Sequence, residues 1–293
     1  MMLNKILIAA TALLLPLSTI AQDMKGASVT KGGLKYRMII DKPGGKTPEV
    51  GDYVKMHLSY TVDDSVLYSS RQLNNNEPVE FQLMKPNFNG DITEGFMEMT
   101  AGDSAILFVP VDSLIKQGTP VLPWMKRGSG QHIVYRIVMV DVKSMEQMKR
   151  YRDEMTKQQK VIDDRKLQDY FKKNNIKARK TESGLYYSIE RDGDGKLPQK
   201  DSNVYVNYTG RTLDGKVFDS NVDPKFMHVE PFKFMLGAGQ VIKGWDIGVA
   251  LFKKGTKGTL YIPSGLAYGP NSPDPNKIPA NGVLIFDVEV LKK

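Results

Sequence analysis

The sequence predicts a two-domain α+β protein in which two related domains are joined by one long helix. Three observations predict this fold. Two segments about 150 residues apart match one another, both contain stretches in which apolar and polar residues alternate, and the region between them is rich in helix formers. Alternation with a period of two is typical of half-buried strands. Because only one short helix can be read in each copy, each domain should be an antiparallel sheet with a helix on one face.

The composition is that of a soluble globular protein. Of 293 residues, 41% are hydrophobic and 25% are charged, which excludes a disordered, a collagen-like and a many-spanning membrane protein. This length is enough for two domains that each bury a core. The chain has a net charge of +8 and no cysteine. Disulfides, thiol nucleophiles and thiolate metal sites are therefore excluded.

Residues 1–21 are expected to be a signal peptide that is absent from the mature protein. They contain Lys5, an apolar run over residues 6–17 and a small-x-small cleavage site at residues 19–21. The run is shorter than the ~20 residues of a bilayer-spanning helix. A permanent anchor is the less favoured alternative, and no integral membrane span is expected in the mature chain. We therefore expect an exported, soluble protein of the periplasm or cell envelope.

The two copies of the repeat occupy residues 22–143 and 178–293. Residues 48–70 align without a gap with residues 198–220. Self-similarity at a fixed offset indicates a repeated structural unit. Further matches join GLKY with GLYY (residues 33–36 and 184–187), LFVP with LYIP (residues 107–110 and 260–263), EGF with KGW (residues 94–96 and 243–245), and residues 134–140 with residues 284–290.

Residues 144–177 are expected to form a helical linker. The stretch from about Ser144 to Asn174 lacks glycine and proline and consists largely of helix formers. Three interpretations remain open: a solvated spacer with one face on a neighbouring domain, which we favour; a homodimer or client-binding helix; and a basic helix for nucleic acid or anionic lipid, which interleaved acidic residues disfavour. Apolar residues recur at helical spacing at Met145, Met148, Tyr151, Met155 and Ile162, and again at Leu167, Tyr170 and Phe171.

In the second copy, residues 204–208 and 284–290 alternate as strands do, residues 213–216 are a hairpin-like turn, and residues 243–252 are the short helix. Common catalytic and metal-binding patterns do not appear. The three histidines, His57, His132 and His228, share no metal-ligand spacing and are expected to be surface or rim residues. There is no nucleophile elbow, phosphate loop or dinucleotide fingerprint. The sequence therefore gives no support to hydrolase, kinase or dehydrogenase chemistry, and no metal or cofactor is expected.

The second copy is unusually rich in aromatic residues at the ends of its segments. Tyrosine and tryptophan carry polar groups and favour half-exposed sites, so Tyr208, Trp245 and Tyr268 suggest a cleft with aromatic walls. The alternative is that such residues form ordinary core, which we favour for Phe234. The remaining members are Phe218, Phe232 and Phe286.

Four stretches of the second copy, between residues 204 and 291, resemble an FKBP-type peptidyl-prolyl cis-trans isomerase domain. In chain order they are VYVNYTGRTLDGKVFDS, PFKFMLGAGQVIKGWDIGV, IPSGLAYG and LIFDVEVL. The first copy matches only weakly and is interpreted as a degenerate FKBP-like domain. The two-copy arrangement is similar to that of envelope folding factors of this family.

The resemblance implies a bent antiparallel sheet around a short helix, with the proline ring of a substrate lying over Trp245. It implies that the Ile242 N–H and the Tyr268 hydroxyl hold carbonyls of the bound chain, and that the partners are unfolded or partly folded proline-containing proteins. The implied catalytic residues are Tyr208, Asp219, Ile242, Trp245 and Tyr268, and the implied substrate-binding residues are Phe218, Phe232, Val241, Ile278 and Phe286.

Isomerisation needs no nucleophile, metal or cofactor. Rotation about an Xaa-Pro amide faces a barrier of ~20 kcal/mol because the planar amide is resonance-stabilised. A dry aromatic pocket that fits the twisted amide lowers this barrier without breaking a bond. Asp219 would then act electrostatically and by positioning rather than as a general base. The alternative function is a non-enzymatic chaperone or assembly factor that grips proline-containing segments.

The sequence departs from the family pattern at several places. Gln240 replaces a frequent glutamate, the loop over residues 221–230 is long and lacks the basic residue that often pairs with Asp219, and the loop over residues 269–279 is rich in proline. The first copy departs further. From the alignment, Leu58, Ser69, Phe96 and Ile115 replace Tyr208, Asp219, Trp245 and Tyr268. We expect the first copy to isomerise poorly or not at all.

Overall fold

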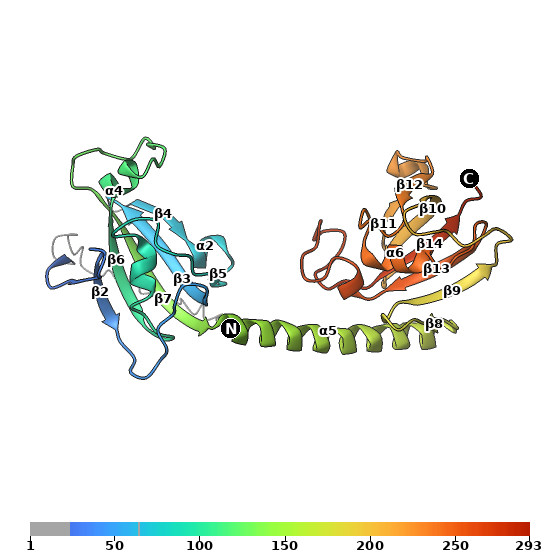
Figure 1. Cartoon of the computed structure of the whole chain (residues 1–293), viewed down its shortest axis with the longest axis horizontal. Coiled ribbons are helices and arrows are strands. Elements are labelled where there is room, and N and C mark those ends of the chain that lie inside the picture. Colours follow the sequence, from blue (N-terminus) through green and yellow to red (C-terminus); the bar gives the residue numbers. More distant parts are fainter. Residues whose placement is uncertain (1–23, 64) are drawn as a thin grey trace, which may run out of the picture. The chain divides into compact units, whose positions relative to one another are not determined.

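The structure is a computed structural model that describes residues 24–63 and 65–293. The expected signal peptide, residues 1–21, lies outside the described residues. The chain divides into two compact units, Met1–Arg150 and Tyr151–Lys293. Each unit contains one antiparallel sheet and a short helix over it (Figure 1). The predicted two-domain α+β fold is therefore confirmed.

The sheet of the first unit has the strand order β1-β2-β6-β7-β3-β4, and β5 pairs with β3. Every pair is antiparallel. The strands are β1 (Ser28–Val29), β2 (Lys35–Ile40), β3 (Tyr53–Val62), β4 (Ser65–Ser69), β5 (Val79–Gln82), β6 (Ser104–Pro110) and β7 (His132–Lys143); the helices are α2 (Ser70–Leu73), α3 (Ile92–Phe96) and α4 (Val111–Lys116). Phe96 of α3 packs with Leu107 and Met139 of the sheet to form the core.

The sheet of the second unit has the order β11-β10-β14-β13-β9-β8, and β12 pairs with β10. This is the order of the first unit with each strand replaced by its counterpart, so the sequence repeat is a repeat of topology. The strands are β8 (Arg179–Lys180), β9 (Tyr186–Arg191), β10 (Asn203–Thr212), β11 (Val217–Ser220), β12 (Phe232–Met235), β13 (Lys257–Ile262) and β14 (Leu284–Val290); the helices are η1 (Pro224–Phe226), α6 (Lys243–Val249) and η2 (Ser264–Leu266).

The long helix α5 spans Met145–Asn174, close to the predicted range. Its start is a capping box in which the Gln147 N–H donates to Ser144 Oγ and the Ser144 N–H donates to Gln147 Oε1. After its end Asn175 is left-handed, with φ of 52°, and the Ile176 N–H donates to the Phe171 carbonyl. Local sequence signals therefore set both ends of α5.

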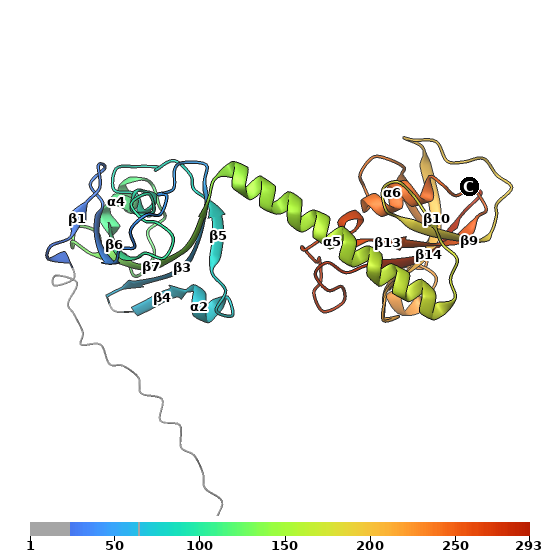
Figure 2. The same ribbon diagram turned by 90° about the horizontal axis from the view of Figure 1, so that it is seen from below.

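The second half of α5 packs on the second unit. Leu167 and Phe171 are buried against Tyr186, Tyr261 and Ile285 on the face of the sheet away from α6. Figure 2 shows α5 crossing these strands. Successive residues of a strand point to opposite faces, so β13 and β14 supply one set of apolar side chains to α5 and another to α6. This explains why three consecutive apolar residues occur in each strand, at residues 260–262 and 284–286.

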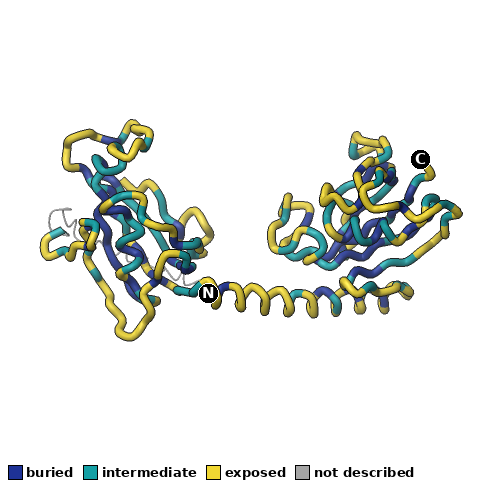
Figure 3. The backbone as a smooth tube through the Cα atoms, in the orientation of Figure 1, coloured by how far each residue is buried: buried dark blue, intermediate teal, exposed yellow. Residues whose placement is uncertain are grey.

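The first half of α5 is different, because most of its side chains are exposed (Figure 3). Tyr151 and Met155 of the predicted apolar stripe are among them, and Met148 is buried; Ile162, in the second half, is also exposed. The predicted helical linker, residues 144–177, contains the boundary between the two compact units, the second of which begins at Tyr151. Among the described residues, no helix combines the length and apolar character that crossing a membrane requires.

Candidate functional site

The candidate site begins at α6, which lies unusually close to the sheet. A Cβ at Gly244 would lie 2.4 Å from Ile262 Cγ2, and one at Gly248 would lie 2.6 Å from Leu260 Cδ1. Only glycine allows this approach. The Asp246 carboxylate accepts from the backbone N–H groups of Gly237 and Gly239, which ties α6 to the preceding loop. Trp245 is thereby fixed over the sheet, and only 4% of its surface is exposed.

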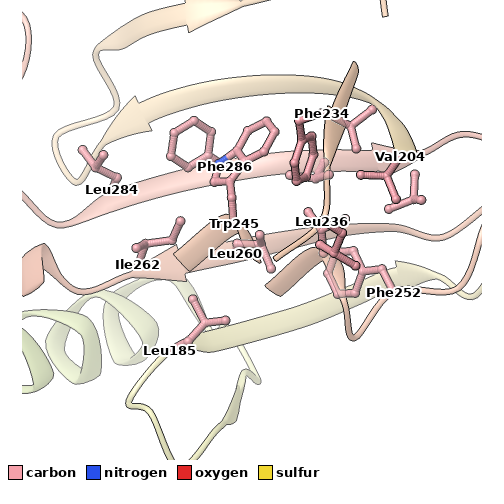
Figure 4. Packing of buried hydrophobic residues seen from close by; sticks show 14 of the residues in the cluster. Leu185, Val204, Phe234, Leu236, Trp245, Phe252, Leu260, Ile262, Leu284 and Phe286 are labelled. Atoms are coloured by element: carbon pink, nitrogen blue, oxygen red, sulfur yellow. The ribbon is translucent and has the colours of Figure 1, made fainter. Parts of the chain in front are cut away.

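Four aromatic rings surround the Trp245 indole. The centroid of Tyr208 lies 5.1 Å away and that of Phe286 lies 5.2 Å away, both nearly perpendicular to it. Phe232 and Phe234 contact it at 5.9 and 5.7 Å. Figure 4 shows Trp245 between Phe286 and Phe234. Edge-to-face contacts of this kind are favoured by the ring quadrupoles, so the cluster is rigid as well as apolar.

Gly210 makes room for this cluster from the opposite strand. A Cβ at this position would lie 2.6 Å from Phe286 Cε1 and 2.8 Å from Phe218 Cζ. Without a side chain there, the rings of Phe218 and Phe286 meet with their centroids 5.6 Å apart. Both rings are buried. Trp245, Phe218 and Phe286 therefore form an apolar floor.

A polar group lies at one side of the floor. The Tyr208 hydroxyl donates to Asp219 Oδ2 at 2.6 Å, and His228 Nε2 lies 2.8 Å from Asp219 Oδ1. Burial, and then the Asp219 carboxylate, raise the pKa of Tyr208 well above its usual range, so the hydroxyl stays protonated and can donate. Asn221 fixes this edge, because its buried amide accepts from the Tyr208 N–H and donates to the carbonyls of Val206 and Glu230.

Two aromatic residues near the polar group are partly exposed. Tyr268 and Phe232 are 38% and 39% exposed. Burial, and then Asp219, raise the pKa of Tyr268. Val241 and Ile242 pack against the core cluster that contains the buried Ile278. The structure thus brings the predicted residues into one connected group with a buried floor and exposed edges: Tyr208, Phe218, Asp219, Phe232, Val241, Ile242, Trp245, Tyr268, Ile278 and Phe286.

Sequence reasoning missed two residues of this group, His228 and Asn221. The loop over residues 221–230 was expected to lack a basic partner for Asp219, but His228 takes that place, while Lys225 pairs with Asp223. Metal-ligand spacing does not detect a histidine that contacts a carboxylate, as His228 does. Gln240, expected to offer mainly a backbone contact, also accepts from the Met235 N–H through its side chain.

The first unit lacks this arrangement, and its structure corrects two positions of the sequence alignment. Gly95 is equivalent to Gly248, because a Cβ added at Gly95 would contact Leu107 and one added at Gly248 would contact Leu260. The residue three positions after each glycine also donates its N–H to the carbonyl of that glycine. This register places Ile92, not Phe96, at the position of Trp245. The strand pairing places Tyr68, not Ser69, at the position of Asp219, because Tyr68 pairs with Tyr60 as Asp219 pairs with Gly210.

A tyrosine ring fills the corresponding space in the first unit. Tyr60, at the position of Gly210, stacks on Tyr68 with centroids 5.6 Å apart and contacts Tyr135 at 5.2 Å. Tyr135 stands where Phe286 does. Burial raises the pKa of Tyr135 to about 12, so it remains neutral. The floor found in the second unit is therefore occupied by side chains of the first unit itself.

Comparison with known proteins shows the family. The family model of FKBP-type peptidyl-prolyl cis-trans isomerases matches residues 44–116 and 195–291, together more than half of the chain. The chain is 47% identical over 120 residues to the FKBP-type peptidyl-prolyl cis-trans isomerase FkpA of Aeromonas hydrophila, covering 41% of each chain, and 44% identical over 126 residues to a probable FkpA of Neisseria meningitidis, covering 43% of each.

FK506-binding protein 1 of Candida glabrata is 45% identical over 112 residues, which are 38% of this chain and 94% of that protein. The crystal structure of AtFKBP13 matches 40% of this chain and 99% of its own, with 34% identity and a TM-score of 0.37. The chain spans about two fifths of the length of the two FkpA relatives it matches. The family model matches more than half of the chain, and 94% of FK506-binding protein 1 of Candida glabrata is covered. The chain therefore belongs to the FKBP-type peptidyl-prolyl cis-trans isomerase family.

Proposed function

We propose that the protein is an exported peptidyl-prolyl cis-trans isomerase that acts on unfolded or partly folded proline-containing proteins, with catalysis confined to the second unit. The observation that carries the proposal is the buried Trp245 floor beside the Tyr208–Asp219–His228 group. Among the described residues of the first unit no comparable floor is seen, because the ring of Tyr60 packs on Tyr68 and Tyr135 where Gly210 leaves room in the second unit.

The site suits a reaction in which no bond breaks. A proline ring is compact and apolar, and the face of Trp245 between Tyr208 and Phe286 is an apolar surface on which such a ring can pack. Water that hydrogen-bonds the planar amide is removed there, and the twisted amide is held by shape. Lowering the barrier by about 5 kcal/mol would accelerate rotation by three to four powers of ten.

Asp219 has an electrostatic role in this proposal. Both of its carboxylate oxygens already accept or share a hydrogen bond, from Tyr208 and with His228. Such a carboxylate is held in one orientation and can stabilise the carbonyl carbon of the amide, which becomes electron-poor when the nitrogen lone pair no longer conjugates with it. Tyr268, which is 38% exposed, supplies a hydroxyl donor for a substrate carbonyl.

The first test uses exchange NMR of a short Xaa-Pro peptide with the chain of residues 22–293. The protein has two tryptophans, which provide a matched pair of variants. Trp245→Ala should abolish acceleration, whereas Trp124→Ala, in a hydrophobic cluster of the first unit, should retain it. Because removing a buried tryptophan costs about 3–5 kcal/mol, Trp245→Phe is included, and the folding of each variant is checked by circular dichroism.

The alternative function is a non-enzymatic chaperone or assembly factor. The Trp124→Phe variant leaves Trp245 as the only tryptophan, so its fluorescence reports peptide binding at the site. Binding of a proline peptide without acceleration of exchange would establish the chaperone and overturn the enzyme. Acceleration that survives both Trp245 variants would place catalysis outside the second unit and refute the proposed site.

A further inference from the structure

Helix α5 contacts the segment that carries Tyr268 through one buried carboxylate. Asp163 is 1% exposed. Its Oδ2 accepts from the Ser264 N–H at 2.8 Å and from the Ser264 hydroxyl at 2.6 Å, and its Oδ1 accepts from the Gln159 side-chain amide at 2.7 Å. Within the part of the chain that the structure describes, neutral donors alone are seen on this carboxylate.

Docking of α5 does not by itself explain this carboxylate. The apolar part of the interface is made by Leu167 and Phe171, and the neighbouring Asp164 already joins the helix to Lys180 and to the Tyr186 hydroxyl. Asp163, unlike Asp164, is buried, and burying a carboxylate is costly unless its hydrogen bonds are well formed. We therefore ask which residues the contact of Asp163 with Ser264 holds in place.

Ser264 connects this contact to the candidate site. It is fully buried and begins η2, and its carbonyl accepts from the N–H groups of Ala267 and Gly269, both at 2.9 Å. These two residues flank Tyr268 on either side. The Gly269 carbonyl in turn accepts from the Asn281 N–H at 2.8 Å. A short series of hydrogen bonds thus runs from Asp163 to the backbone on both sides of Tyr268.

Among the described residues of the first unit, no such series is seen. Val111 stands at the position of Ser264, since LFVP and LYIP are equivalent in the two sheets and precede these residues. Valine has no hydroxyl, and its N–H donates to the Gln131 carbonyl instead. The hydrogen-bonded clamp is therefore found in the unit that has the aromatic floor and an exposed tyrosine at its edge.

We propose that Asp163 is a positioning residue for isomerisation, which holds Ser264 and through it the Tyr268 hydroxyl at the edge of the site. The proposal rests on the proposed isomerase function. It makes the linker helix a part of the catalytic unit. Misplacement of a positioned group by even a small distance is expensive in catalysis, so loss of the carboxylate should lower kcat/KM by about tenfold.

The test compares four substitutions in the chain of residues 22–293. Asp163→Ala removes the acceptor, and Asp163→Asn retains one oxygen and should restore part of the activity. Leu167→Ala weakens the same interface but leaves Asp163 and Ser264 in place. Asp169→Asn removes an equal charge from an exposed position of the same helix. For each variant we would measure kcat and KM for an Xaa-Pro peptide, the melting temperature, and the ring signals of Tyr268 in labelled protein, assigned with Tyr268→Phe.

We expect Asp163→Ala to lower kcat more than it raises KM and to shift the Tyr268 signals, while Leu167→Ala lowers the melting temperature but keeps both. Unchanged kcat and Tyr268 signals in Asp163→Ala would overturn the proposal. Equal loss of activity in Leu167→Ala would overturn it too, because helix docking alone would then explain the effect. An inactive wild-type protein would refute the proposed function instead, and the Tyr268 signals would still decide whether Asp163 positions that residue.

Discussion

Removing the docked half of α5 should destabilise the second unit severely. A chain that starts at residue 178 loses Leu167 and Phe171 from their contacts with Tyr186, Tyr261 and Ile285. Full burial of each such side chain is worth about 1.5–3 kcal/mol. The buried Asp163–Ser264 contact and its neighbours add about 1 kcal/mol per hydrogen bond. The sum is roughly 5–8 kcal/mol, as large as the whole free energy of unfolding of many domains.

The assay is urea unfolding followed by Trp245 fluorescence, since Trp245 is the only tryptophan after residue 124. Chains starting at residues 151 and 157 differ only in exposed positions and should unfold at the same urea concentration. The chain starting at residue 178 should unfold about 2–4 M earlier or not fold at all. Equal midpoints for the three chains would refute the reasoning, because α5 would then contribute nothing to the second unit.

Three further predictions follow from single contacts. Gly210→Ala should cost about 1–3 kcal/mol of stability by overpacking and should lower isomerase activity, whereas Gly265→Ala, with open space around it, should do neither in thermal melts and exchange assays. His228→Leu should lower kcat/KM by freeing Asp219, while His228→Gln should retain most of it; equal effects would exclude the hydrogen bond. The hydrogen bond from Lys180, and then that from Tyr186, lower the pKa of Asp164, so its stabilisation is present near neutral pH and is lost as the pH falls through that lowered pKa. The melting temperature should therefore fall more steeply with acidification, below about pH 4, in wild type than in Asp164→Asn.

The predicted strands and long helix were confirmed because their signals are local. Alternation, turn residues and the Ser144–Gln147 cap act over a few residues, and the structure places strands β10 and β14 and helix α5 where these signals occur. The members of the candidate site came from the resemblance. Nothing in their spacing alone brings Ile278 beside Trp245, because the loop between β13 and β14 sets that contact.

The sequence did not reveal two kinds of feature: register differences of one or a few residues between the two units, and the burial of polar side chains. The hairpins have equivalent bulges after Tyr60 and Gly210, but Thr61 and Val66 are separated by one residue fewer than Arg211 and Val217, so a gap-free alignment matches the wrong residues after the turn. Asp163 stands in the run VIDDRK, which reads as a solvated helix face. Its burial depends on Ser264, which is a hundred and one residues away.

The position of β14 has a consequence for the order in which the protein folds. It is the last strand of the chain, yet it lies in the middle of its sheet between β10 and β13. Its Ile285 packs with α5 and its Phe286 packs with Trp245, so neither face of the sheet is complete until β14 is available. The first unit is complete with β7, which ends at residue 143. As the chain emerges, the N-terminal unit can therefore fold early, whereas the C-terminal unit depends on long-range contacts and closes only once β14 is available.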